Sequence, residues 1–252
     1  MTFPVYFELG PLRLHPHLVM EALAYAVGLY VSLFRRLKKK DVVSPAQRSS
    51  ISVGALVGAL MGAKLLVMLQ HANLLMTDWR QFALLALQGK TIVGALLGGL
   101  AGVEITKKLI GVCRSTGDSF VYSVLWGMAI GRVGCFLTGL SDRTYGIATS
   151  LPWGVDFGDG IARHPTQLYE IGFLVLVFFV LRRCQLLSLR EGDLFKIYMI
   201  AYLGFRFFID FIKPEFRPLL GLSAIQIACA LGLGYYWKDA VRLCRTVWKP
   251  TG

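Results

Sequence analysis

Residues 119–139 read SFVYSVLWGMAIGRVGCFLTG, an apolar run in which Arg132 is the one charged side chain. A helix of this length rises about 30 Å, enough to cross the hydrocarbon layer of a membrane. A cation near the middle of such a span costs about 2.5–3.5 kcal/mol on insertion scales, so its presence indicates a function. A second arginine, Arg206, stands inside another apolar segment. We therefore expect a buried anion site, with a phosphate at membrane depth as its ligand.

Six further apolar segments accompany this run. The chain has 252 residues, of which 55% are hydrophobic and 17% charged, and this composition leaves room for several membrane spans. We expect an all-α fold: a polytopic membrane helical bundle of about seven transmembrane helices, forming a single domain over residues 1–252. The expected segments are 17–34, 51–70, 82–103, 119–139, 166–181, 194–212 and 219–237.

The basic residues flank the apolar segments. A net charge of +12 is compatible with nucleic-acid binding, but no aromatic-basic readout motif occurs, so we expect lipid headgroups rather than a nucleic acid as partner. Placing the amino terminus outside puts 17 cations in the cytoplasm and 6 outside, which follows the positive-inside rule. The pattern predicts a multi-pass membrane protein with its amino terminus outside and its carboxyl terminus in the cytoplasm. Residues 1–16 lack the pattern of a removable signal peptide.

The cysteines show no metal-ligand spacing and fall within helices or near the cytoplasm. We expect no disulfide, no metal and no organic cofactor. Cys135 stays outside our catalytic assignment, because a free cysteine is usually a small buried hydrophobe. The five cysteines are Cys113, Cys135, Cys184, Cys229 and Cys244.

Two glycine stripes lie in the second and third segments, with a spacing of four residues in each. Small residues at this spacing let a helix backbone approach its neighbour closely, so we interpret both stripes as helix-packing surfaces. The stripes are Gly54, Gly58 and Gly62, and Gly94, Gly98 and Gly102.

The third segment is interrupted by Gln88-Gly89-Lys90-Thr91. One interpretation is a broken helix whose second half starts at a cavity, where Lys90 and the helix start would attract an anion. The other is that the first half is an interfacial piece and that Lys90 extends to the membrane surface.

Residues 140–165 form a long polar loop on the outer side, between the fourth and fifth helices. Loops of this length inside a compact bundle are often functional. His164 either acts as an acid or base, or serves a structural role at the helix entrance beside Pro165.

Arg206 and Asp210 stand one helical turn apart, and Lys213 follows. The pair is either a neutralised structural couple or part of a site shared with Arg132. In the second case, two planar guanidinium groups would suit a phosphate diester better than lysines would, which favours a phospholipid ligand.

Three motifs follow one another along the chain: GRVGCFLTG (131–139), RHPTQLYE (163–170) and FRFFIDF (205–211). In these motifs and their order, the chain resembles the bacterial prolipoprotein diacylglyceryl transferases from about residue 10 to residue 237. The resemblance implies transfer of a diacylglyceryl group from phosphatidylglycerol to the cysteine thiol of a prolipoprotein signal peptide, with release of glycerol phosphate. It also implies a location in the bacterial plasma (inner) membrane.

The family's essential arginines match Arg132 and Arg206. We assign Arg132 to the lipid phosphate and Arg206 to the leaving group, although the two roles are exchangeable. His164 joins Arg206 as a catalytic candidate. Further substrate-binding candidates are Gly131, Gly134, Arg163, Glu170, Asp210 and Lys90.

This chain departs from the family pattern at four positions. They are His17 for a tyrosine, Val93 for a histidine, Cys135 for an asparagine and Lys213 for an arginine. Either an electropositive cavity activates the acceptor thiol with His164 or His17 as substitute base, or the chain acts on another acceptor. A lipid or anion transporter is a third alternative, but such proteins usually show paired interrupted segments, and only the third segment is interrupted here.

Overall fold

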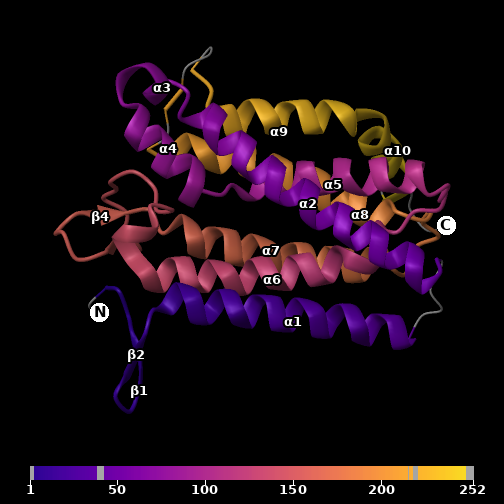
Figure 1. The fold of residues 1–252 in the computed structure, drawn as a ribbon, viewed down its shortest axis with the longest axis horizontal. Helices are drawn as coiled ribbons and strands as arrows, with labels where there is room; N and C mark the ends of the chain where they lie inside the picture. Colours follow the sequence, from indigo (N-terminus) through magenta and orange to yellow (C-terminus); the bar gives the residue numbers. More distant parts are fainter. Residues whose placement is uncertain (1–2, 39–42, 215, 218–220, 248–252) are drawn as a thin grey trace.

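The computed structural model describes residues 3–38, 43–214, 216–217 and 221–247. Its α-helices are α1 Pro16–Lys38, α2 Pro45–Gln70, α3 Leu74–Thr77, α4 Trp79–Gln88, α5 Ile92–Leu109, α6 Gly117–Thr138, α7 Thr166–Cys184, α8 Asp193–Ile209, α9 Ala224–Tyr235 and α10 Trp237–Val247. Helices α1, α6, α7 and α9 run roughly along the long axis of the molecule, and α2 crosses the bundle obliquely (Figure 1). Two 3-10 turns, η1 Gly139–Asp142 and η2 Asp210–Ile212, follow α6 and α8. The strands form two small antiparallel hairpins, β1 Phe7–Leu9 with β2 Leu12–Leu14 and β3 Val155–Asp156 with β4 Ala162–Arg163.

The expected all-α membrane fold is confirmed in its class. A helix lies in each of the seven expected segments, although residues 219–220 fall outside the described part of the chain. Within that part, α1, α2 and α6 are long and apolar enough to cross a membrane, and the bent pair α4–α5 makes a fourth if it counts as one span. Helix α9 has only 12 residues and rises about 18 Å, which is less than the hydrocarbon thickness. The number of seven spans therefore stays a prediction.

The two glycine stripes meet along α2 and α5, so the interpretation of the stripes as helix-packing surfaces is confirmed, and the structure adds that they pack against each other. A Cβ atom added at Gly58 would come closer than 3.0 Å to the carbonyl oxygen of Gly98, and one added at Gly62 would do the same at Gly94. The absence of side chains at these positions allows the two backbones to touch, which is how small residues hold helices together in lipid.

The predicted interruption of the third segment is also confirmed. Helix α4 ends at Gln88, α5 begins at Ile92, and their axes differ by 61°. The Lys64 ammonium donates to the carbonyl oxygen of Gly89 at 2.9 Å and to that of Leu87. A cation from α2 thus satisfies backbone acceptors that the break frees, as a membrane interior requires.

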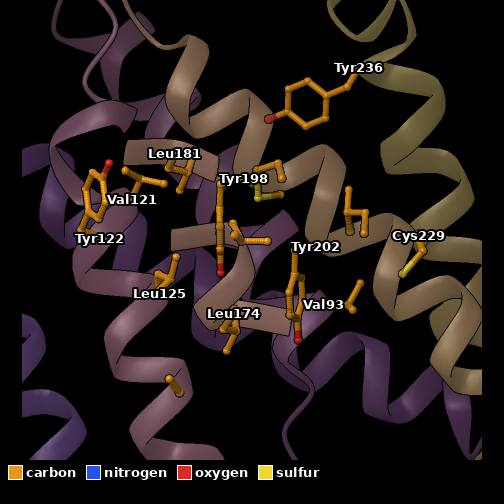
Figure 2. Close-up of a cluster of buried hydrophobic side chains, with 14 of the residues drawn as sticks. Val93, Val121, Tyr122, Leu125, Leu174, Leu181, Tyr198, Tyr202, Cys229 and Tyr236 are labelled. Carbon is orange, nitrogen blue, oxygen red and sulfur yellow. The ribbon is translucent and has the colours of Figure 1, made fainter. Parts of the chain in front are cut away.

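The apolar core lies where α8 packs against α6, α7 and α9. Tyr198, Met199, Tyr202 and Leu203 of α8 are fully buried. Figure 2 shows Val93, from the first turn of α5, in the same cluster as Tyr202. The aliphatic residue that replaces the family's histidine therefore packs in the core.

The chain termini lie at opposite ends of the bundle (Figure 1). The β1–β2 hairpin, which our sequence analysis did not predict, and the connection that carries β4 both lie at the amino-terminal end. Helix α9 starts with a capping box, in which Ser223 and Gln226 bond to each other's backbone N–H groups. The same Ser223 hydroxyl donates to Asp210, so this cap joins α9 to the end of α8.

Candidate active site

A cavity of about 1370 Å³ opens among α1, α2, the α4–α5 break, α6 and α8. It is larger than the roughly 300–1,000 Å³ of sites for small molecules, which suits a lipid. Of the predicted site residues, Gly131, Arg132 and Arg206 line it together with Lys90.

Arg132 enters the cavity from α6 and is held from behind by α7. Its Nε lies 2.8 Å from Oε2 of Glu170, and both side chains are at least nine-tenths buried. The other oxygen of Glu170 accepts a hydrogen bond of 2.8 Å from the hydroxyl of Tyr202. Because Glu170 is bonded on both sides, it orients the guanidinium.

Arg206 is held in a similar way from the end of its own helix. Its Nη2 lies 3.3 Å from Oδ1 of Asp210, which is fully buried. Asp210 in turn accepts a hydrogen bond from Ser223. Nη1 of Arg206 is buried and has no hydrogen-bond partner within the described residues. Such a donor requires an acceptor, and a ligand in the cavity can supply one.

The charges at the cavity favour an anion. Glu170 is under the electrostatic influence of Arg132, Arg206 and Lys213 at once. Leaving the histidines aside, five cations line the cavity among the described residues, against two carboxylates in the lining and two more, Glu170 and Asp210, behind the arginines, so the site has a net positive charge. The cations are Lys90, Arg132, Arg143, Arg206 and Lys213, and the lining carboxylates are Glu21 and Asp142.

Lys90 contributes at the break between α4 and α5. Its ammonium lies 2.6 Å from Oε1 of Glu21, which also accepts a hydrogen bond of 2.9 Å from Tyr25. This arrangement supports the interpretation in which the break faces a cavity. Sequence reasoning missed Glu21, although a carboxylate inside an apolar span is itself a signal of function.

Besides Glu170 and Asp210, which lie behind the arginines, three predicted site residues do not line this cavity in the described structure. Gly134 packs against α1, where an added Cβ would lie 2.8 Å from Cβ of Met20. Arg163 makes a two-pronged ion pair with Asp159, and its hydrogen bonds lower the pKa of that exposed carboxyl. In this structure both residues face other parts of the protein, and their contact with substrate stays a prediction.

The third of these residues is His164. Its Nδ1 lies 3.1 Å from the hydroxyl of Tyr169, and its carbonyl oxygen accepts a hydrogen bond from the backbone N–H of Gly146. These contacts connect the loop of residues 140–165 to the start of α7. They favour the structural alternative over the acid–base one.

Sequence reasoning also missed a group on the α1 side of the cavity. His17, Cys135 and Asp142 line it together, and Nδ1 of His17 lies 3.1 Å from Oδ1 of Asp142. His17 and Cys135 stood out as departures from the family pattern, whereas nothing in the sequence singled out Asp142.

Residues 4–236 match the family model described as prolipoprotein diacylglyceryl transferase. Several curated proteins named phosphatidylglycerol–prolipoprotein diacylglyceryl transferase are similar to this chain. The one from Campylobacter lari is 30% identical over 242 residues, which cover 90% of this chain and 86% of the relative. The one from Clostridium tetani is 30% identical over 222 residues, with 85% and 86% covered. The one from a Wolbachia of Brugia malayi is 25% identical over 255 residues, with 94% and 86% covered.

Proposed function

Because this chain belongs to the prolipoprotein diacylglyceryl transferase family, we infer that it transfers a diacylglyceryl group from phosphatidylglycerol to the cysteine thiol of a prolipoprotein signal peptide. The thiolate sulfur attacks the terminal glyceryl carbon, the bond between that carbon and the phosphate oxygen breaks, and glycerol phosphate leaves. Nothing is oxidised or reduced. The leaving phosphate gains one negative charge, and preorganised cations accelerate such a step by stabilising this charge.

The observation that carries the site assignment is the buried Nη1 of Arg206, which lacks an acceptor within the described structure and belongs to a cavity-lining side chain. We assign Arg132 to the lipid phosphate and Arg206 to the leaving oxygen, and the geometry allows the exchange of these roles. Glu170 and Asp210 are positioning residues, because each holds one guanidinium from behind. The net positive charge of the cavity suits the anionic headgroup of phosphatidylglycerol.

Purified protein supplied with phosphatidylglycerol and a lipobox peptide should form a thioether-linked peptide and free glycerol phosphate. Mass spectrometry of the peptide and an enzymatic phosphate-ester assay measure the two products. Movement of lipid without either product would support transport instead. A lipobox peptide that stays unmodified, together with glycerol phosphate release that depends on another thiol, would indicate a different acceptor.

His164→Gln should retain transfer to within about threefold of the wild-type rate, because the contacts of His164 are structural. A general acid or base contributes about 10²–10⁴-fold, so a loss of that size at unchanged thermal stability would return His164 to the mechanism. The measurement is kcat/KM for thioether formation over a range of pH.

For the membrane topology, we propose seven spans, with the amino terminus and residues 140–165 outside and the carboxyl terminus in the cytoplasm. The opposite positions of the termini in Figure 1 support this arrangement. Cys113 and Cys244 are exposed and lie in the cytoplasm under this proposal. A membrane-impermeant maleimide should therefore label both only after spheroplasts are permeabilised. Labelling of either cysteine in intact spheroplasts would contradict the orientation.

A further inference from the structure

One cluster on the cavity wall has no role in the steps above. It consists of His17 from α1, Cys135 from α6 and Asp142 from η1, and each offers one ligand atom within 4.8 Å of the other two. All three residues line the cavity that holds Arg132 and Arg206. The cluster is therefore accessible to a substrate in that cavity.

We propose that His17, Cys135 and Asp142 bind a zinc ion, and that the open fourth position of this ion takes the thiolate of the acceptor cysteine. Catalytic zinc sites commonly have three protein ligands drawn from imidazole, thiolate and carboxylate groups, and leave one position open. A thiolate together with an imidazole selects zinc over the hard cations magnesium and calcium.

The spacing of the cluster fits such an ion. Tetrahedral bonds of about 2.0–2.3 Å put neighbouring ligand atoms roughly 3.3–3.8 Å apart. Nδ1 of His17 and Oδ1 of Asp142 lie 3.1 Å apart, and one ligand atom from each of the three residues lies within 4.8 Å of the other two.

The surroundings of the ligands supply one orienting contact. The second oxygen of Asp142 accepts a hydrogen bond of 2.5 Å from the hydroxyl of Thr144. Such hydrogen bonds orient carboxylate ligands in known metal sites. The other ring nitrogen of His17 faces a carboxylate oxygen of Glu21 at 3.7 Å, which is longer than a hydrogen bond.

The proposal rests on the transferase function and explains how the acceptor thiol is activated. The family's histidine is replaced here by Val93, which cannot accept a proton, so the acceptor thiol needs another means of activation. Zinc lowers the pKa of a bound thiol, and the proton leaves to solvent on binding. The sulfur then attacks the glyceryl carbon, and the neutral thioether product binds the metal weakly and departs. Nη1 of Arg132 lies 3.9 Å from Sγ of Cys135, so the proposed zinc site lies next to the phosphate-binding arginine.

The first test is the metal content of the wild-type protein, purified in detergent with a histidine-free tag. We expect about one zinc per chain, lost on chelation and regained with zinc chloride, as for a site with three protein ligands. His17→Gln and Cys135→Ser should each weaken zinc binding by at least about tenfold. His15→Gln and Cys113→Ser are matched controls, since both residues are exposed and outside the cluster, and they should bind zinc like the wild type.

The second test uses cobalt in place of zinc. Wild-type protein should show the charge-transfer absorption of a cobalt–thiolate bond, and Cys135→Ser should lose it. A lipobox peptide should change the cobalt spectrum, whereas the same peptide with serine in place of cysteine should leave it unchanged. A peptide that leaves the spectrum unchanged would overturn the acceptor role of the fourth position.

Two outcomes separate this proposal from the proposed function. Wild-type protein that binds no zinc after reconstitution, yet forms the thioether, would overturn the zinc site and leave the transferase intact. Zinc binding that depends on Cys135, without product from phosphatidylglycerol, would support the site and refute the transferase function.

Discussion

Arg132→Lys should lower kcat/KM for diacylglyceryl transfer by at least about 100-fold, the cost of losing one preorganised donor to a developing oxyanion. Nε of Arg132 is engaged by Glu170, so the guanidinium can donate to a phosphate only from its remaining nitrogens. A lysine offers a single ammonium that cannot meet both groups in this geometry. The measurement is the initial rate of thioether formation at varied phosphatidylglycerol concentration. Arg206→Lys should show a similar loss, because its guanidinium also pairs with a carboxylate.

A matched control for these changes is Arg114→Lys. Arg114 is exposed and pairs with Glu191 outside the cavity, so its replacement should leave the rate unaltered. Near-normal rates for Arg132→Lys or Arg206→Lys, at wild-type thermal stability, would refute the assignment of that arginine to the phosphate.

Gly98→Val should greatly lower the yield of folded protein. The added Cβ would lie closer than 3.0 Å to the carbonyl oxygen of Gly58 and to Cα of Gly62, and both are backbone atoms that cannot rotate away. Helices α2 and α5 would have to separate along their seam, which costs at least about 3 kcal/mol, at the upper end of overpacking effects. The measurement is the unfolding temperature in detergent, together with the yield of monodisperse protein.

The neighbouring position provides the control. A Cβ added at Gly99 meets its nearest atom, the carbonyl oxygen of Ala55, at an ordinary 3.5 Å. Gly99→Ala should therefore unfold near the wild-type temperature. A stable Gly98→Val protein would show that the two backbones do not touch at this point.

Features that depend on a local pattern of residue types could be predicted from the sequence. The helical segments follow from apolar runs, and the glycines repeated every four residues identified packing faces on α2 and α5, although only the structure showed that these faces meet each other. The break before α5 follows from Gln88 to Thr91, because these residues interrupt an apolar run. Arg132 and Arg206 stood out for a similar reason, since a cation is costly in hydrocarbon wherever the rest of the chain lies.

The neighbours across the cavity were decided by the tertiary structure alone. Gly134 follows Arg132 by two residues, yet it faces α1 while Arg132 faces the cavity, because successive residues on a helix point in different directions. The absence of metal-ligand spacing led us to expect no metal, but spacing reports only on ligands that are close in sequence. His17, Cys135 and Asp142 meet across more than a hundred residues through the packing of α1 on α6. That packing depends on how side chains of separate helices fit together, and no local pattern in one helix encodes it.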